Sequence, residues 1–389
     1  MLFTLEALNA KHGDALLLHY GPSPAEPRLI VIDGGPAGVY DDTLSRRLAE
    51  LRKARAGAGS LKIRLLMVSH IDDDHINGVL DLAKAIARAD EQGATPDWDV
   101  LSLWHNSFSD LVKPIRSADL GARAAGVAAA DIATAAGFPF GMKDEAAIAI
   151  AASVGQGRDL RQIAEMLAWN VNHGFDSLVK GGAKKANLRK IDKALEFVVL
   201  GPLQEQLDAL QNEWAKKVEK LRKKKLGPAE AQAEIAAFLD KSIPNLSSIA
   251  VLARSGGKTM LLTGDARGDF LLDGLRGAKL LDGGTLHVDV LKVPHHGSDR
   301  NVDAAFFSSV TADHYVVSAD GKHGNPDNAM LKMLTDARGK DEYAIHLTNR
   351  VPHAMSFLAK AKKGRKFEVD VRGTGQSSVR IELGATLRE

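Results

Sequence analysis

The feature that most constrains this chain is an apolar run followed at once by a dense group of acidic and imidazole side chains. The run, Ile63–Val68, is broken only by Arg64 and suits a buried strand. Five of the six residues from His70 to His75 are histidine or aspartate. Carboxylates crowded at a strand end repel one another unless cations offset their charge. The sequence therefore predicts a metal site at the end of this strand.

The spacing inside this group suits two metal ions. In a tight loop, His70 and Asp72 can face one ion while Asp74 and His75 face a second. Two ions about 3.5–4 Å apart can share a bridging hydroxide, which the metals make nucleophilic at neutral pH. The chain has no cysteine, so its ligands must be His, Asp or Glu, a donor set that favours zinc, manganese or other borderline-to-hard ions. The competing interpretation is a solvated, Asp-rich turn with incidental histidines.

The rest of the chain alternates short apolar segments with amphipathic ones, which indicates an α/β layered fold. Helices are predicted at Asp41–Ala56 and Asn77–Arg88. Strands are predicted at Phe3–Leu8, Ala15–Tyr20, Leu29–Ile32, Val100–Trp104, Ile249–Ala253, Thr259–Leu262, Val288–Val293, Tyr315–Ser318, Tyr343–Thr348 and Phe367–Val371.

The chain divides into three parts by composition. Residues 1–105 and 242–389 carry the strand and helix alternation and are interpreted as two halves of one domain. Residues 106–241 are rich in alanine and predict a mostly helical insertion, with one embedded strand near 195–200.

The overall composition is that of a soluble globular protein, with 45% hydrophobic and 26% charged residues. The N-terminus lacks a basic stretch followed by an apolar one, and no apolar run reaches the roughly 18 residues of a membrane span. We therefore expect a cytoplasmic protein that does not contact membranes. The sequence does not identify a protein partner.

One basic stretch offers a contact for nucleic acid. The net charge is only +2, so such a contact must come from a local patch. A solvated helix face is the simpler interpretation, and a footprint for the phosphate backbone of DNA or RNA is the other. The cations of this stretch are Lys216, Lys217, Lys220, Arg222, Lys223, Lys224 and Lys225.

The motifs of the chain resemble those of the metallo-β-lactamase superfamily and follow the same order. The superfamily loop His-x-His-x-Asp-His reads His-x-Asp-x-Asp-His here, a variant similar to the hydrolase domain of ComEC-type DNA-uptake proteins. The other matching segments are Lys11–Ala15, Leu29–Gly35, Asn245–Ser248, Thr263–Asp265 and Lys292–Ser298. The resemblance covers everything outside the insertion. It implies a four-layer αββα metallo-β-lactamase sandwich with a helical insertion.

The resemblance also implies roles for individual residues. Asp265 would bridge both ions, and His296, which precedes glycine, would be the last ligand. His295 would then face the substrate as a phosphate donor or general acid, and the reverse assignment of these two histidines stays open. Asp33 would hold a ligand histidine through its other ring nitrogen. Asp74 could orient the nucleophile in addition to binding metal.

Two positions depart from the family pattern. The superfamily often has one more histidine for the first metal, and His105 is the candidate, with a partly exposed loop histidine as the alternative. The ComEC-type Gly-His-Pro element reads Gly324-Asn325-Pro326 here. Asn325 can hydrogen-bond a phosphate but cannot transfer a proton at neutral pH, so His323 is the candidate for that role.

The expected chemistry is hydrolysis by a metal-bridging hydroxide. The resemblance favours cleavage of phosphodiesters by a nuclease that acts on DNA or RNA. One alternative is a small-molecule hydrolase for a lactone or phosphoester, with the insertion as a lid. The other is a catalytically weakened protein that binds a partner. Aromatic residues are only 5% of the chain, which favours a small substrate or a nuclease that contacts only the backbone.

Overall fold

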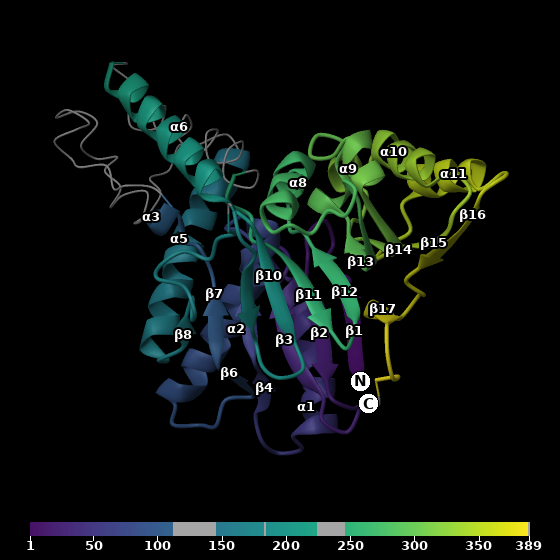
Figure 1. The fold of residues 1–389 in the computed structure, drawn as a ribbon. Helices are drawn as coiled ribbons and strands as arrows, with labels where there is room; N and C mark the ends of the chain where they lie inside the picture. The colour runs from purple at the N-terminus through teal and green to yellow at the C-terminus, as the bar shows by residue number, and fades with distance from the viewer. Residues whose placement is uncertain (112–144, 183, 224–245, 388–389) are drawn as a thin grey trace.

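Two β-sheets that face each other form the centre of the molecule (Figure 1). The computed structural model describes residues 1–111, 145–182, 184–223 and 246–387. A smaller two-stranded sheet consists of β4 (Leu61–Ile63) and β6 (Trp98–Val100).

The first sheet has seven strands in the order β17-β1-β2-β3-β5-β7-β8. They are β1 (Leu2–Leu8), β2 (Leu16–Gly21), β3 (Arg28–Ile32), β5 (Leu65–Met67), β7 (Ser102–Trp104), β8 (Asn170–Val171) and β17 (Ser378–Glu382). Strands β3, β5, β7 and β8 run parallel to one another, whereas β3 is antiparallel to β2. The residues that follow β3 and β5 therefore emerge at one edge of the sheet.

The second sheet has eight strands in the order β16-β15-β14-β13-β12-β11-β10-β9. They are β9 (Asn187–Lys190), β10 (Glu196–Gly201), β11 (Ala250–Ser255), β12 (Lys258–Leu262), β13 (Leu286–Lys292), β14 (Val310–Val317), β15 (Glu342–Leu347) and β16 (Lys366–Val371). The five strands from β12 to β16 run parallel. The segments after β12, β13 and β14 thus leave the sheet at a common edge.

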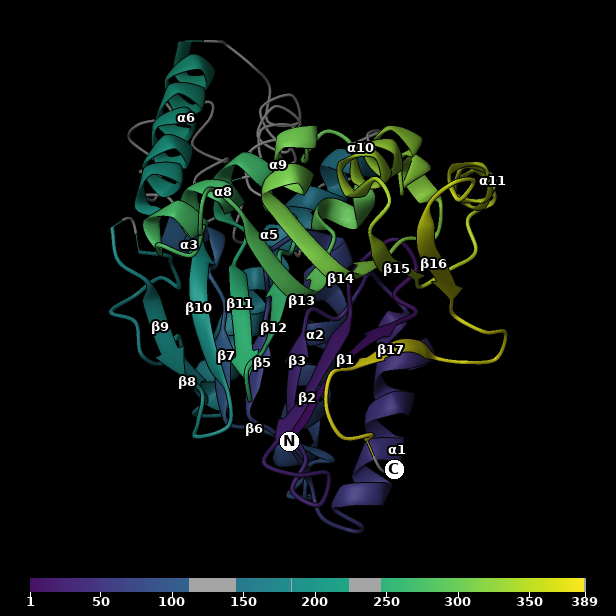
Figure 2. The same cartoon turned by 45° about the vertical axis from the view of Figure 1, so that its right-hand side comes forward.

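Helices cover the outer face of each sheet, which confirms the predicted αββα layers. The helices on the first sheet are α1 (Ser45–Arg55), α2 (Asp73–Glu91) and α5 (Glu145–Met166). Those on the second are α8 (Gly268–Gly277), α9 (Ala304–Ser309), α10 (Asn328–Arg338) and α11 (Pro352–Ala361). Figure 2 shows the second group along the upper side of its sheet. Among the helices that the structure describes, none is long and apolar enough to cross a membrane.

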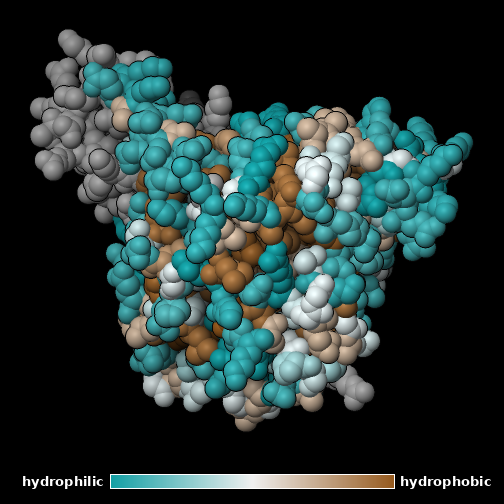
Figure 3. All heavy atoms as spheres, in the orientation of Figure 1, coloured by the Kyte–Doolittle hydropathy of each residue, from teal (hydrophilic) through white to brown (hydrophobic). Residues whose placement is uncertain are grey.

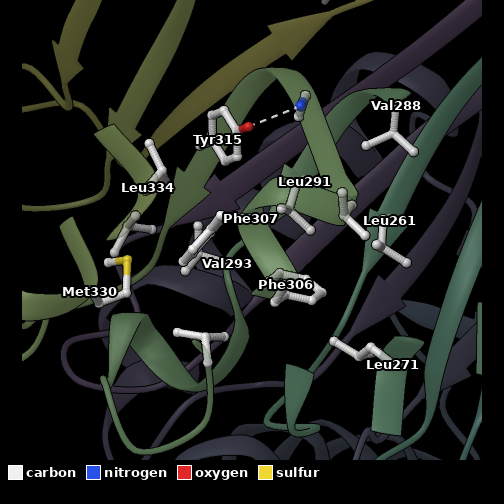
Figure 4. Close-up of a cluster of buried hydrophobic side chains, with 14 of the residues drawn as sticks. Leu261, Leu271, Val288, Leu291, Val293, Phe306, Phe307, Tyr315, Met330 and Leu334 are labelled. Atoms are coloured by element: carbon white, nitrogen blue, oxygen red, sulfur yellow. Dashed lines mark hydrogen bonds between the residues drawn. The ribbon is translucent and has the colours of Figure 1, made fainter. Parts of the chain in front are cut away.

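Three apolar clusters hold these layers together. One lies between the sheets and joins Leu5 of the first to Phe197 of the second. The outer cluster on the second sheet packs Leu291 of β13 against Phe306 and Phe307 of α9 (Figure 4). In the view of Figure 3, apolar residues gather in the middle of the molecule and polar ones cover the helices at the upper right. Burial of apolar surface in these clusters is the main force that stacks the layers.

The predicted strand over residues 63–68 is in fact split between two sheets. β4 ends at Ile63 and pairs with β6, whereas β5 begins at Leu65 and enters the first sheet. The amide of Arg64 between them donates to the carbonyl of Leu29. The predicted strand Val100–Trp104 divides in the same way, between β6 and β7. One apolar run therefore contributes a strand to each of two sheets. The hydrophobic periodicity of the sequence does not reveal this division.

The middle of the chain contributes to both large sheets. The predicted strand near 195–200 is β10, but β8 and β9 are additional strands that the sequence analysis did not predict. The described helices of this part are α3 (Phe108–Leu111), α5 and α6 (Gln204–Lys223). Residues 112–144 and 224–241 of the predicted insertion lie outside the described residues.

Two glycines allow β3 and α2 to approach closely beside the predicted metal loop. The amide of Gly34 donates to the carbonyl of His75 at 2.7 Å, and the amide of Gly78 donates to that of Gly35 at 3.1 Å. A Cβ atom on Gly78 would lie 2.1 Å from the carbonyl oxygen of Gly34. No side chain fits there, so glycine is required on steric grounds.

We predict that Gly78→Ala lowers the free energy of unfolding by about 1–3 kcal/mol, because the added methyl group overpacks this contact. Gly155 in α5 is the matched control, since a Cβ there meets nothing within 4 Å in the described part of the chain. Gly155→Ala should raise stability by up to about 1 kcal/mol through helix propensity. Urea denaturation measures both, and changes of the same sign would contradict the prediction.

Candidate metal centre

The loop from Ser69 to His75 turns directly into helix α2. Asp72 is the N-cap residue, and its carbonyl accepts from the amides of His75 and Ile76. The helix begins at Asp73, four residues before the predicted start at Asn77. Acidic residues are favourable in a first helical turn, because the unpaired amides there carry partial positive charge. This turn fixes the backbone that carries the acidic and imidazole groups.

Asp265, which follows β12, lies at the centre of the site. Its Oδ1 is 3.3 Å from Nε2 of His75, and its Oδ2 is 3.8 Å from Nε2 of His70. Oδ2 also lies 3.6 Å from Nε2 of His296 and 3.5 Å from Nε2 of His295. The far half of the chain therefore reaches the predicted loop through one buried carboxylate.

The remaining loop residues surround the same point. Oδ2 of Asp72 lies 3.5 Å from Nε2 of His70, and Oδ2 of Asp74 lies 3.4 Å from Nε2 of His296. The Nε2 atoms of His75 and His296 are 3.2 Å apart. Six of the seven residues predicted to bind metal thus lie together, and only His105 does not.

His295 and His296 sit on a strained turn after β13. Their φ angles are 48° and 55°, in the left-handed region that non-glycine residues seldom adopt. His296 is buried and its Nδ1 donates to the carbonyl of Ser318 at 3.0 Å, whereas the side chain of His295 is 31% exposed. Strain of this kind is kept where the surroundings hold it for function. The turn directs the buried ring into the site and the other ring to its mouth.

Asp33, after β3, holds His75 from behind. Its Oδ2 accepts from Nδ1 of His75 at 2.9 Å, and its Oδ1 accepts from the amide of Ser69 at 2.7 Å. This contact puts a hydrogen on Nδ1, so Nε2, which faces Asp265, is the nitrogen that a metal ion can bind. A carboxylate behind a histidine in this way orients the ring and increases its basicity as a ligand.

Asp14 and Lys292 form a buried ion pair beneath His296. Both side chains are at most 1% exposed, and the Lys292 ammonium contacts Oδ2 of Asp14. Oδ1 of Asp14 lies 3.4 Å from Nδ1 of His296. The sequence analysis included both residues in matching segments but gave Asp14 no role. Asp14, His75, Asp265 and His296 each offer a ligand atom within 4.8 Å of the others.

His105 is buried completely and lies against α5, so it is not the partly exposed histidine of our alternative. Its Nε2 donates to the carbonyl of Gly157 at 3.3 Å, and its amide donates to Oδ1 of Asn172. Burial lowers the pKa of His105 to about 4, so its ring is neutral at pH 7. Within the described residues, no contact joins His105 to the Asp265 centre.

The two other predicted residues lie on a neighbouring loop. His323 is exposed with a φ of 60°, and its ring meets that of His12 at 5.9 Å between centroids. Asn325 is partly buried and precedes Pro326. The amide of Asp327 donates to the carbonyl of Gly297, which ties this loop to the turn that carries His296.

In the metal-free protein, protonated histidines balance the negative charge of the carboxylates. Burial alone would lower the pKa of His296, but the carboxylates of Asp265 and Asp14 raise it to about 10. Burial also opposes protonation of His75, but Asp265 and Asp33 raise its pKa well above the ordinary 6.5. Burial would raise the pKa of Asp14, yet the Lys292 ammonium holds it below its ordinary value. A metal ion would replace these protons on the imidazoles.

The residues present fit a divalent ion. Nε2 of His70 is buried and has no hydrogen-bond partner, although it faces Asp72 and Asp265. Buried polar atoms are almost always paired, so such an atom indicates a missing ligand. The donors are carboxylate oxygens and imidazole nitrogens, which suit zinc or manganese.

Comparisons with solved structures find similar chains at low sequence identity. The metallo-β-lactamase-fold protein YhfI from Bacillus subtilis is 11% identical, with a TM-score of 0.40 over 98% of this chain and 99% of that one. A candidate metal-dependent hydrolase from Parabacteroides distasonis is 9% identical, with a TM-score of 0.35 over 94% and 92%. No family profile and no curated protein matches the chain.

We predict that Lys292→Met lowers the free energy of unfolding by about 3–5 kcal/mol, because it leaves the buried Asp14 carboxylate unpaired. The double variant Lys292→Met with Asp14→Asn should recover at least half of that loss, since neither member of the pair is then left charged without the other. Urea denaturation of the metal-free protein measures both. Equal losses in the single and double variants would show that the pair is not coupled.

We also predict how the stability of the metal-free protein depends on pH. The raised pKa values of His75 and His296 add stability below pH 6.5 that is lost as pH rises toward about 10. The lowered pKa values of Asp14 and Asp265 add stability above pH 3.8 that is lost as pH falls. Thermal unfolding with and without a chelator tests this. The metal-free Tm should fall above pH 6.5, and the metal-loaded Tm should fall less, because bound imidazoles are already neutral.

Proposed function

We propose that this protein is a metal-dependent hydrolase that holds two divalent ions, zinc or manganese, at the Asp265 centre. The observation that carries the proposal is the convergence of buried imidazoles and carboxylates from both halves of the chain on Asp265, with Nε2 of His70 left unpaired. Charges so crowded are tolerated in a protein interior only when they are compensated.

The contacts divide into two groups that share Asp265, which supports two ions rather than one. His70 and Asp72 lie near each other on one side, and Asp74, His75 and His296 lie on the other. When bound, the ions would supply Lewis acidity and a water that ionises near neutral pH.

The protein's own groups then orient the reaction. Asp33 keeps the Nε2 of His75 free to bind, and Asp74 is partly exposed, so it can accept a hydrogen bond from the attacking water. His295 presents its ring at the mouth of the site, where Nε2 can donate to the departing oxygen. In this proposal the scissile bond would lie between His295 and Asp74, which both border the Asp265 centre.

We further propose that the substrate is a phosphodiester in DNA or RNA. The basic stretch lies on α6, where Lys216 and Lys220 are exposed and Arg222 and Lys223 belong to the same helix; Lys224 and Lys225 lie outside the described residues. Figures 1 and 2 both show α6 projecting beyond the sheets. A projecting cationic helix suits contact with a phosphate backbone, and the scarcity of aromatic residues argues against base stacking.

We predict that the protein cleaves linear DNA, plasmid DNA, RNA or bis(p-nitrophenyl) phosphate when manganese or zinc is added. His75→Ala and Asp265→Asn should each lower the rate by at least about a hundredfold, because both remove ligands. His173→Ala is the matched control, since His173 is exposed on a turn after β8, and it should leave the rate unchanged. Metal content is measured for every variant.

The outcomes separate the candidate functions. Cleavage of nucleic acid that depends on His75 supports a nuclease. Cleavage of the small diester alone restricts the proposal to a small-molecule hydrolase. Full metal binding without hydrolysis of any substrate would contradict the enzymatic proposal and favour a binding role.

A further inference from the structure

We propose that His12, Lys322 and His323 form a subsite that binds a phosphate group of the substrate beside the metal centre. This inference rests on the proposed function and specifies how the same site recognises its substrate. The three residues come from opposite ends of the chain, and nothing in the αββα core requires their contact.

Two loops place these side chains together. His12 lies between β1 and β2, and Lys322 and His323 lie on the short 3-10 turn Lys322–Gly324 that follows β14. Ser318, just after β14, ties the loops to each other, because its hydroxyl donates to the carbonyl of Gly13. The carbonyl of the same residue accepts from Nδ1 of His296. One residue therefore links both loops to a candidate metal ligand.

The subsite is held next to the acidic loop as well. The amide of Asp14 donates to the carbonyl of Asp74 at 3.1 Å. A Cβ atom on Gly13 would lie 2.0 Å from that same carbonyl oxygen, so the segment that carries His12 is pressed directly onto the loop. Glycine at this position permits the approach. The two residues that follow His12 thus hold it beside the acidic loop through backbone contacts.

The three side chains present hydrogen-bond donors, and Asp74 and Asp320 act on His12 electrostatically without forming an ion pair with it. Nζ of Lys322 is 3.2 Å from Nε2 of His12, so the ammonium donates to that nitrogen and the ring keeps its hydrogen on Nδ1. His323 meets the edge of the His12 ring. None of the three forms an ion pair within the described residues. The nearby Asp320 accepts from the backbone amide of Lys322 at 2.8 Å.

The backbone of each of the two loops adopts an energetically unfavourable conformation. Lys11, which precedes His12, has a φ of 56°, and His323 has a φ of 60°. Residues with side chains adopt this region rarely, and such strain gathers at functional sites. Here it aims an imidazole from each loop at a shared position.

A phosphate group is the ligand that this arrangement suits. The ammonium and two imidazoles can donate to non-bridging oxygens, and a charged donor makes such bonds short and strong. Hydrogen bonds of Asp14 and Ser318 link these loops to Asp74 and His296, so the bound phosphate would be the reacting group or its neighbour on the same strand. A neutral lactone offers no such anion.

Inorganic phosphate is the probe for this subsite. Its binding to the metal-loaded full chain is measured by calorimetry for the wild type, Lys322→Gln and Lys322→Arg. Lys62→Gln is the matched control, because Lys62 is an exposed lysine on β4. We expect about tenfold weaker binding for Lys322→Gln, with metal content unchanged, and near-normal binding for Lys322→Arg and the control. Equal binding by Lys322→Gln and the wild type would overturn the proposal.

Hydrolysis gives a second readout that keeps the two proposals apart. If phosphodiesters are cleaved, Lys322→Gln should raise KM about tenfold and change kcat less, because binding rather than chemistry is affected. An unchanged KM would count against the subsite. If no phosphodiester is cleaved but phosphate binding still depends on Lys322, the subsite is supported and the proposed hydrolase is contradicted.

Discussion

Repulsion among buried carboxylates is the constraint on which the site depends. Asp14, Asp33, Asp74 and Asp265 all gather around His75 and His296, and each is given its own source of positive charge or hydrogen bonds. Asp14 forms an ion pair with a buried lysine, and Asp33 accepts hydrogen bonds from Ser69 and His75. Asp265 lies in contact with several histidines. A fold that brought these groups together without such compensation would not be stable. The αββα architecture meets the requirement because parallel strands from both sheets end at the same place.

Much of the fold could be predicted because its strands are apolar runs bounded by turn residues. Strands β1, β2, β3 and β11 to β16 lie within a few residues of their predicted positions, and the layers follow from their alternation with helices. The split at Arg64 could not be predicted, since which sheet a short apolar run joins depends on pairing partners far along the chain. The same holds for β8 and β9, which are short edge strands with little apolar pattern.

The residues of the candidate site likewise divide into those that the sequence predicts and those that it does not. The local cluster from His70 to His75 is visible in sequence because its residues are adjacent. The pairing of Asp14 with Lys292 is not visible in sequence, because it joins two distant segments. A lysine at the end of an apolar strand is the one signal in the sequence for a buried ion pair. His105 was ambiguous for a related reason: its strand end is correctly placed, but α5 from the middle of the chain occupies its Nε2.

The pairing of β17 with β1 has a consequence for the order in which the protein can be completed. All seven residues of β1 are buried, and one of its two neighbours is β17, which follows all the other described strands in the sequence. During synthesis on the ribosome, one edge of this apolar strand stays unpaired while the 369 residues between β1 and β17 are made. An exposed strand edge of this kind pairs readily with other chains. Truncation just before Ser378 would therefore leave the edge of β1 permanently open and promote aggregation, even though every residue of the candidate metal centre would still be present.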